Sequence, residues 1–345
     1  MSRHTSAALF RDADPIGLLD AVAADLEAQD VIFARDGDAI DCDTGVGRLH
    51  LQSEGGALRI EVHADNASNL HMLCEGVSAR LDRLRHDSVA LDWQGGDLRT
   101  GGLPPNVRTG QVIARSRIGT KFVRLRVSAD DLSDFALSGL HIRLLIPIGG
   151  RAPVWPYLTA KGRTVWPGEG DGMHMPAYTI RAIDPEEGWL DVDVFLHGNG
   201  STCRWAEEVG IGAEVGISGP GGGWMPPGRS WLLAGDETAL PAIARILEAA
   251  SDDVSAEVLV MVDGPQDVLP LAAPAGARIT WLYRDRGDDL VAEVKAAPLP
   301  AGPGRHIWFA AEKSLAANVR SWLRGSAGVD RKDCYIAAYW VDGKS

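Results

Sequence analysis

A strand-to-helix junction near the C-terminal third is the first place where residue types and spacing suggest chemistry. Trp231-Leu-Leu has the pattern of a buried strand, and the apolar spacing of 239–247 predicts a helix directly after it. Gly235 allows a sharp turn between the two, and Thr238 is a candidate helix cap. The free N–H groups at the start of such a helix bind phosphate. Taken alone, the same pattern also fits an ordinary strand–helix junction.

A glycine-rich turn in the middle of the chain is a second candidate phosphate site. Gly198 and Gly200 permit close approach of a ligand to the backbone. Ser201 and Thr202 are candidate caps of a short helix whose N–H groups would receive a diphosphate, and Arg204 in the same turn would add positive charge. By itself, a turn of this composition is weak evidence.

Composition limits the partners. The chain has 345 residues, which predicts two or three domains, and its formal charge of −13 argues against nucleic acid and anionic membranes as partners. We find no signal peptide and no stretch long enough to span a bilayer. The cysteines are scattered without the spacing of a zinc or iron–sulfur site, so we expect no metal centre and a cytoplasmic protein.

Three regions differ in pattern. Residues 1–95 combine helical spacing and alternating strands, which predicts a small α+β domain, followed by a Gly/Pro-rich linker at 94–105. Residues 106–228 contain many short strand patterns, which indicate an antiparallel β-barrel. Residues 229–345 alternate strand and helix, which predicts an α/β domain with a parallel sheet and ligands at the carboxyl ends of its strands.

These motifs, in this order, resemble those of the siderophore-interacting proteins, flavin-dependent ferric-siderophore reductases related to ferredoxin-NADP reductases. The resemblance covers residues 107 to 343. It implies FAD bound to the barrel and NADPH or NADH bound to the α/β domain. Residues 1–95 resemble a small domain of unknown function that is sometimes fused to this family. Because the cofactor motifs all lie beyond Val107, we expect residues 1–95 to be dispensable for flavin reduction.

The resemblance assigns the catalytic positions to a strand of the barrel. The segment 176–181 matches the family's Arg-x-Tyr-Thr/Ser motif, which implies that the Tyr178 ring lies against the isoalloxazine and that the Thr179 hydroxyl bonds flavin N5. Pro176 replaces the arginine that pairs with the cofactor's pyrophosphate in the family. Losing such a charge-assisted contact costs about 1.5–3 kcal/mol of binding free energy.

The glycine-rich turn matches a second family segment, His-Gly followed by Trp-Ala. The resemblance therefore adds two residues to the expected FAD contacts, which become His197, Gly200, Ser201, Thr202, Arg204 and Trp205.

The C-terminal motifs supply the expected dinucleotide and substrate contacts. Gly235 and Thr238 would hold the dinucleotide phosphates, and Arg284 would meet the adenosine ribose or a 2′-phosphate, with Arg286 as second candidate. A solvated strand end is an equally simple interpretation of these two arginines. The family ends in Gly-Tyr-Trp and a basic residue. Here Val341 takes the basic position, which leaves Lys313 and Lys344 as candidate substrate contacts.

The implied function is an FAD-dependent ferric-siderophore reductase that passes electrons from NAD(P)H through the flavin to Fe(III) and releases iron in the cytoplasm. The departures at Pro176 and Val341 keep a non-catalytic siderophore- or flavin-binding protein open, and a flavin reductase for another acceptor is a third reading. Ferredoxin is a less favoured donor, since an acidic surface repels an acidic partner.

Overall fold

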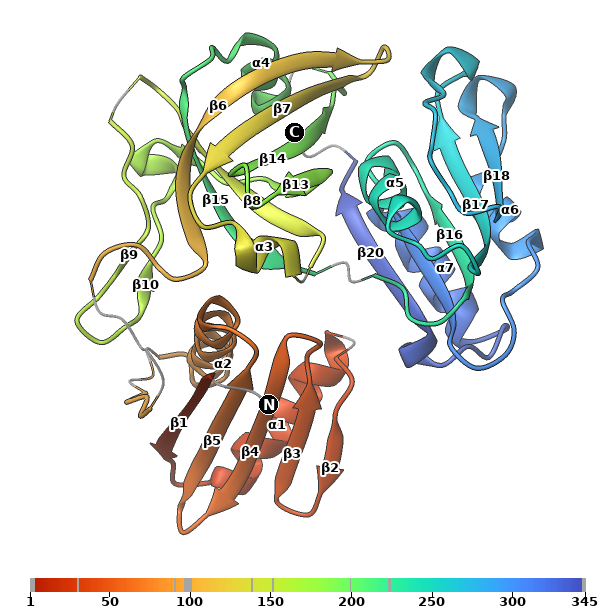
Figure 1. Cartoon of the computed structure of the whole chain (residues 1–345). Coiled ribbons are helices and arrows are strands. Elements are labelled where there is room, and N and C mark those ends of the chain that lie inside the picture. Colours follow the sequence, from red (N-terminus) through yellow and green to blue (C-terminus); the bar gives the residue numbers. More distant parts are fainter. Residues whose placement is uncertain are drawn as a thin grey trace. The chain divides into compact units, whose positions relative to one another are not determined.

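The computed structural model describes residues 4–29, 31–87, 89, 91–95, 101–137, 139–150, 152–198, 200–222 and 225–342. The chain divides into two compact units (Figure 1). The first comprises residues 1–108, 145–174 and 216–219, and the second comprises 109–144, 175–215 and 220–345.

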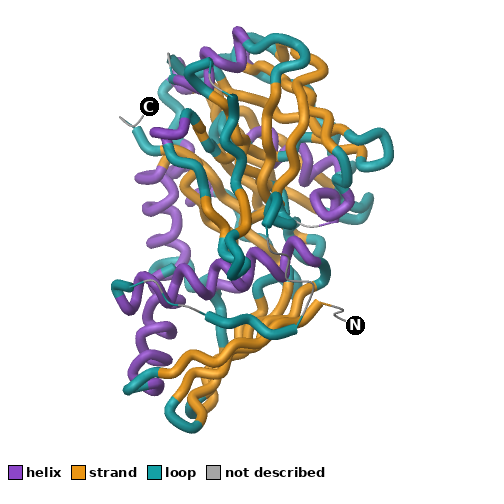
Figure 2. The backbone as a smooth tube through the Cα atoms, turned by 90° about the vertical axis from the view of Figure 1, so that its left-hand side faces the viewer, coloured by secondary structure: helices purple, strands orange, loops and turns teal. Residues whose placement is uncertain are grey.

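The N-terminal part of the first unit is an antiparallel sheet with both helices on one face (Figure 2). Its strand order is β1-β5-β4-β3-β2. The elements are β1 (His4–Arg11), α1 (Pro15–Ala28), β2 (Ala34–Asp36), β3 (Ala39–Asp43), β4 (Gly47–Glu54), β5 (Ala57–Ala64) and α2 (Ala67–Arg85). Asp14 caps α1 by accepting from Gly17 N at 2.9 Å, and Asn66 caps α2 by accepting from Asn69 N at 2.8 Å. Apolar side chains of both helices pack on alternate residues of the strands, which forms the core of this part.

A short hairpin of the first unit is held by polar side chains of α2. The hairpin strands are β9 (Tyr157–Leu158) and β10 (Thr164–Val165). Arg163 donates to the Asp82 carboxylate at 2.8 Å and lies 3.1 Å from a Glu75 oxygen. The Glu75 carboxylate also accepts from Thr164 N at 3.2 Å, and His71 Nε2 lies 2.9 Å from Thr164 Oγ1. Two acidic side chains and one imidazole therefore fix this hairpin on the helix.

The middle of the chain forms a barrel-like antiparallel sheet. Its strand order is β11-β8-β15-β6-β7-β14-β13, and β12 pairs with β8. The strands are β6 (Val107–Ile118), β7 (Phe122–Ala129), β8 (His141–Pro147), β11 (Met173–His174), β12 (Ala177–Thr179), β13 (Ala182–Asp184), β14 (Trp189–Phe195) and β15 (Glu214–Gly221). Two helices accompany them, α3 (Ser133–Leu137) and α4 (Ser201–Glu208).

The C-terminal part is a parallel sheet of order β18-β17-β16-β19-β20. Its elements are β16 (Ser230–Gly235), α5 (Leu240–Glu248), β17 (Ser255–Val262), β18 (Gly276–Tyr283), α6 (Leu290–Ala296), β19 (Arg305–Glu312), α7 (Lys313–Arg324) and β20 (Cys334–Trp340). Helix α5 packs on one face of the sheet and helices α6 and α7 on the other. Short 3₁₀ helices span Glu169–Asp171, Pro265–Asp267, Arg284–Arg286 and Arg331–Asp333.

The predicted fold classes are confirmed: an α+β N-terminal part, a barrel-like antiparallel sheet and a parallel α/β sheet. Strand β1 is an addition, since no strand was predicted for residues 4–11. The domain boundaries 1–95, 106–228 and 229–345 stay predictions.

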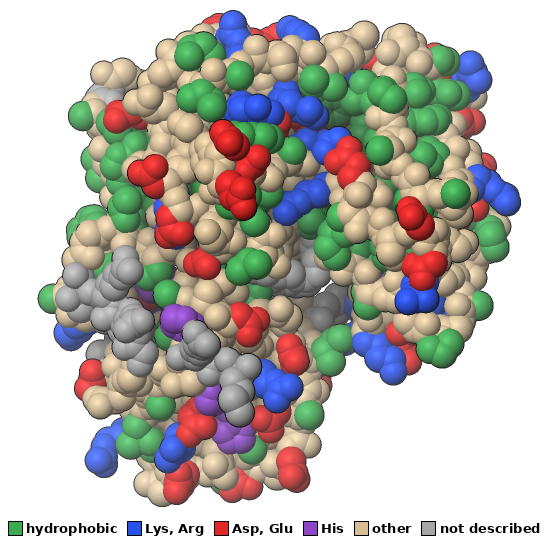
Figure 3. All heavy atoms as spheres, viewed as in Figure 1, with side chains coloured by type: hydrophobic (Ala, Val, Ile, Leu, Met, Phe, Trp, Pro, Cys, Tyr) green, Lys and Arg blue, Asp and Glu red, His purple; other side chains and the backbone are tan. Residues whose placement is uncertain are grey.

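Acidic and basic side chains are interspersed on the face seen in Figure 3. No helix in the described part of the chain has the length and apolar character of a membrane span.

We predict that Arg163→Ala destabilises the protein. Burial raises the pKa of Glu75, and removing Arg163 takes away a cation that offsets this cost. The free energy of unfolding of the full chain should fall by about 1–3 kcal/mol in chemical denaturation. Arg48→Ala is the matched control, because that side chain is 81% exposed and its ion pair with Asp43 is long. Equal losses in the two variants would contradict the role given to Arg163.

A second prediction concerns pH. Burial lowers the pKa of His71 to about 4, below its ordinary value near 6.5. Stability from the neutral imidazole is therefore complete above about pH 6.5 and is lost as the pH falls toward 4. Between pH 7 and 5 the wild type should lose about 1–2 kcal/mol more stability than His71→Gln, which does not titrate. Parallel losses in the two proteins would show that His71 is not the titrating group.

Candidate functional site

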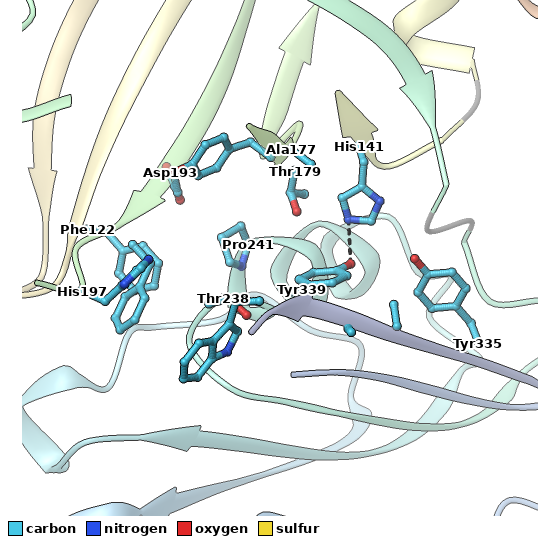
Figure 4. A pocket seen from close by; sticks show the side chains of 15 residues that line it. Phe122, His141, Ala177, Thr179, Asp193, His197, Thr238, Pro241, Tyr335 and Tyr339 are labelled. Atoms are coloured by element: carbon cyan, nitrogen blue, oxygen red, sulfur yellow. Dashed lines mark hydrogen bonds between the residues drawn. The ribbon is translucent and has the colours of Figure 1, made fainter. Parts of the chain in front are cut away.

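The second unit contains a cavity of about 300 Å³ between strands of the antiparallel sheet and the carboxyl edge of the parallel sheet (Figure 4). Tyr178 and Thr179 of β12 line it, together with His141 of β8. From the parallel sheet come Thr238, Pro241 and the end of β20, including Tyr339 and Trp340. The lining is mainly aromatic and apolar with a few polar groups, which is the usual character of a cofactor site.

The two predicted flavin motifs meet at this cavity. The Tyr178 hydroxyl shares a hydrogen bond with the Thr202 side chain at the start of α4. Burial raises the pKa of Tyr178, so the phenol stays protonated at neutral pH. Thr179 pairs with His141 across the β12–β8 ladder and is 5% exposed. The sequence motifs, about twenty residues apart, are thus brought to one wall.

The capping roles expected of Ser201 and Thr202 are wrong. Gly200 is the N-cap residue of α4, and no side chain caps the helix. Thr202 is the second residue of the helix and bonds Tyr178 instead. Ser201 and Arg204 are exposed on the first turn. Gly198 has φ +66°, which explains the glycine there, and the space around Gly200 is open, so a ligand can approach the N-terminal turn of α4.

The cap expected at Thr238 is also wrong, and Gly235 has a different role. Ala239 is the N-cap residue of α5, and the helix has no side-chain cap. Thr238 donates its hydroxyl to Asp236 at 2.5 Å. Gly235 is the last residue of β16, where a Cβ would lie 2.5 Å from both the Ala239 Cβ and the Ala310 carbonyl oxygen. This glycine is needed for close packing of strand and helix.

Asp236 organises the edge of the parallel sheet. Its side chain is 1% exposed and accepts hydrogen bonds from donors on three segments. One oxygen accepts from the Thr238 amide and hydroxyl, and the other accepts from Glu312 N at 3.1 Å and Trp340 Nε1 at 2.8 Å. The ends of β16, β19 and β20 are thereby tied to one carboxylate.

His141 and Tyr339 join the two walls of the cavity. The Tyr339 hydroxyl lies 2.6 Å from His141 Nε2, and the rings meet edge to face (Figure 4). Burial lowers the pKa of His141 to about 4, so this imidazole is neutral at physiological pH. At the other end of the cavity, the His197 ring stacks on Phe195 and faces Trp340. Aromatic side chains thus flank the space on two sides.

The remaining predicted residues lie apart from the lining of the cavity. Arg284 forms ion pairs with Glu237 and Asp263, so its guanidinium already donates hydrogen bonds to two carboxylates of the protein. Trp205 of α4 is half-buried, and Lys313 is exposed at the start of α7. Lys344 lies outside the described residues. Among the described residues that line the cavity there is no lysine or arginine, and the Asp193 carboxylate there is held by Arg124 at 2.6 and 2.8 Å.

No role was predicted for three important residues: Asp236, His141 and Tyr339. Each bonds at least one partner far along the chain, so a local pattern gives no signal for that contact. Position alone could have found Asp236, since it directly follows the first strand of a parallel sheet.

The residues present fit a flavin. The cavity offers the Tyr178 ring and the Thr179 hydroxyl on one wall and a helix start with open space at Gly200 nearby. These groups match the flat ring, the polar ring edge and the diphosphate of FAD. Among the described residues, no group of three or more His, Cys, Asp or Glu side chains has the arrangement of a metal site.

Comparison with known proteins agrees with this geometry. Residues 111–224 match the model of the siderophore-interacting FAD-binding domain, and residues 229–343 match that of the siderophore-interacting protein. An uncharacterized Mycobacterium bovis protein is 37% identical over 183 residues, 48% of this chain; the chain spans only 65% of that relative's length. Ferric vibriobactin reductase ViuB of Vibrio cholerae is 27% identical over 245 residues, which cover 68% of this chain and 89% of ViuB.

Solved structures give the same result. The siderophore-interacting protein SipS from Aeromonas hydrophila is 30% identical with a TM-score of 0.59, and the match covers 70% of this chain and 93% of SipS. A siderophore utilization protein from T. fusca is 28% identical with a TM-score of 0.62, covering 71% and 97% of the two chains. These matches make the chain a member of the siderophore-interacting protein family, with that family's FAD-binding domain.

Proposed function

We propose that this protein is an FAD-dependent reductase that passes electrons from NADH or NADPH to the Fe(III) of a ferric siderophore. The observation that carries the proposal is that Tyr178, Thr179 and His197, from the two flavin motifs, line one cavity opposite the carboxyl edge of a parallel sheet. One wall suits a flavin, and the opposite edge is where parallel sheets bind dinucleotides. The reductase name of ViuB and the siderophore-interacting family support the choice of substrate.

FAD, when bound, supplies the hydride-accepting and one-electron chemistry. The protein's residues orient it and exclude water. The Tyr178 ring provides a flat apolar surface, and its bond with Thr202 holds that ring in place. The Thr179 hydroxyl is available to bond the polar edge of the flavin ring. The N–H groups of the first turn of α4 would receive the diphosphate together with Arg204. No step requires a general base.

The end of β20, on the opposite side of the cavity, would position and enclose the bound flavin. Tyr339 is held by His141, and Trp340 by Asp236, so the end of β20 presents aromatic rings at fixed places. Lys313 and Lys344 remain the proposed cationic contacts for the ferric siderophore. The cytoplasmic location expected from the sequence stays a prediction.

The direct test follows bound flavin through both half-reactions. Protein reconstituted with FAD should lose its flavin absorbance when mixed anaerobically with NAD(P)H, and a ferric siderophore added next should restore it while Fe(II) appears in a chelator assay. Thr179→Val should slow flavin reduction roughly tenfold, equivalent to about 1.4 kcal/mol, with little change in FAD affinity. Thr280→Val, on β18 and outside the cavity lining, is the matched control and should keep the wild-type rate.

Other outcomes distinguish the alternatives. If the protein binds no FAD at saturating concentration, the proposal of a reductase is wrong, and the protein is a siderophore-binding protein or scaffold. Flavin that is reduced by NAD(P)H but is not reoxidised by ferric siderophores would indicate a reductase for another acceptor.

A separate prediction follows from Pro176. Its carbonyl accepts from Leu144 N at 2.9 Å, so the position belongs to the sheet, but it lacks the side-chain charge that the family uses for the pyrophosphate. We expect Pro176→Arg to lower the FAD dissociation constant by up to about tenfold, or about 1.4 kcal/mol, in an equilibrium titration. Pro298→Arg adds the same charge at an exposed loop and should have no effect. An unchanged affinity in a folded Pro176→Arg protein would show that another group, such as Arg204, already meets the diphosphate.

A further inference from the structure

The strand order of the parallel sheet is one that, in doubly wound folds, binds the adenosine end of a dinucleotide beside the second strand, here β17. The order β18-β17-β16-β19-β20 is that of a doubly wound sheet in which the first strand, β16, lies at the switch point and β17 is the second strand. In such sheets, an acidic residue at the end of the second strand selects the ribose 2′-hydroxyl of NAD, whereas a nearby arginine accommodates the 2′-phosphate of NADP. Asp263 directly follows β17.

The arginine that the sequence suggests for a 2′-phosphate is engaged by two carboxylates. Arg284 forms a two-point ion pair with Glu237, one bond of which measures 2.7 Å, and a further bond of 2.9 Å with Asp263. Glu237 is buried and Asp263 is 47% exposed. A phosphate at Arg284 would have to displace these partners or sit beside them, and either alternative has an electrostatic cost.

Lys121 is held by the Asp263 carboxylate as well. Lys121 Nζ lies 3.1 Å from an Asp263 oxygen, and the charges of Asp267 and Glu237 attract it further. Lys121 and Arg284 are thus balanced by Asp263 and Glu237 before any ligand arrives. Asp267 adds a buried carboxylate that accepts from the Thr120 hydroxyl. This end of the sheet offers carboxylate oxygens to a hydroxyl group and little net positive charge to a phosphate.

Arg286, which follows β18, is a further cationic side chain at this edge of the sheet. The Arg286 guanidinium carbon lies 4.5 Å from the centroid of the Tyr283 ring, and in the described part of the chain no carboxylate lies at ion-pair distance from it. A 2′-phosphate held by Arg286 is therefore the competing outcome, and the test includes this residue.

Building on the function proposed above, we propose that the electron donor is NADH rather than NADPH, and that Asp263 is the specificity-determining residue, accepting a hydrogen bond from the adenosine 2′-hydroxyl. The half-exposed carboxylate keeps acceptor capacity beyond Lys121 and Arg284. A 2′-phosphate at the same place meets Asp263 and Glu237 and is repelled, which gives selectivity by an unfavourable contact.

The test compares donors and their adenosine fragments on the full chain loaded with FAD. We expect kcat/KM for flavin reduction to be at least tenfold higher with NADH than with NADPH. Asp263→Ala should lower that ratio at least fivefold, while Glu237 still holds Arg284. In calorimetric titrations without any reaction, wild-type protein should bind 5′-AMP more tightly than 2′,5′-ADP, and Asp263→Ala should reverse or abolish the difference.

A control variant and a variant that tests the competing outcome complete the experiment. Asp252→Ala makes the same charge change at an exposed position before β17, at the opposite end of that strand, and should leave the donor ratio unchanged. Arg286→Ala tests the competing outcome: the donor ratio should stay within about twofold, and a larger change would assign the adenosine end to Arg286 and overturn the role given to Asp263. A wild type that uses NADPH as well as NADH, or an Asp263→Ala ratio equal to that of the wild type, overturns this inference and leaves the reductase proposal standing. Flavin that neither dinucleotide reduces, although chemical reductants do, overturns the proposed donor class itself.

Discussion

The buried carboxylate of Asp236 is the constraint on which the edge of the parallel sheet, and with it one wall of the cavity, depends. A carboxyl group that is 1% exposed is stable only if its oxygens are satisfied, and here four hydrogen-bond donors satisfy them. Those donors come from the loop after β16, the end of β19 and the indole of Trp340. One side chain therefore ties three strand ends together, among them the end of β20, where Tyr339 and Trp340 line the cavity.

The same rule of paired burial governs the charges around the cavity. Asp193 is satisfied by Arg124, Asp191 by Arg126, and Glu237 by Arg284, each through two-point contacts. In each of these pairs the positive charge of the arginine balances the negative charge of the carboxylate, so these three arginines serve to hold the protein's own acidic side chains. Orientation of a flavin would then rest on ring contact, hydroxyl groups and a helix start, since free positive charge is scarce in the described lining.

Sequence patterns predicted the sheets and the segments of the site, because apolar periodicity and glycine-rich turns are local signals. They failed for the hydroxyl groups. Thr202 and Thr238 stand where caps are common, yet each side chain bonds a partner outside its helix, Tyr178 and Asp236 respectively. Tyr178 comes from another strand, and Asp236, although only two residues before Thr238, is held in place by donors from β19 and β20, so a local pattern cannot tell which partner a hydroxyl will bond. Arg284 illustrates the same limit, since the carboxylates that engage it lie 21 and 47 residues away.

The hairpin held by α2 changes how the N-terminal residues should be regarded. Its two strands lie in the chain between β8, which carries His141, and β12, which carries Tyr178 and Thr179. Arg163 and Thr164 of this hairpin bond Asp82, Glu75 and His71 of α2. The expectation that residues 1–95 are dispensable rests on the Gly/Pro-rich linker and on the position of the cofactor motifs beyond Val107, and these contacts argue against it. Removing α2 would take these partners away from Arg163 and Thr164, in the segment of chain that connects β8 with β12.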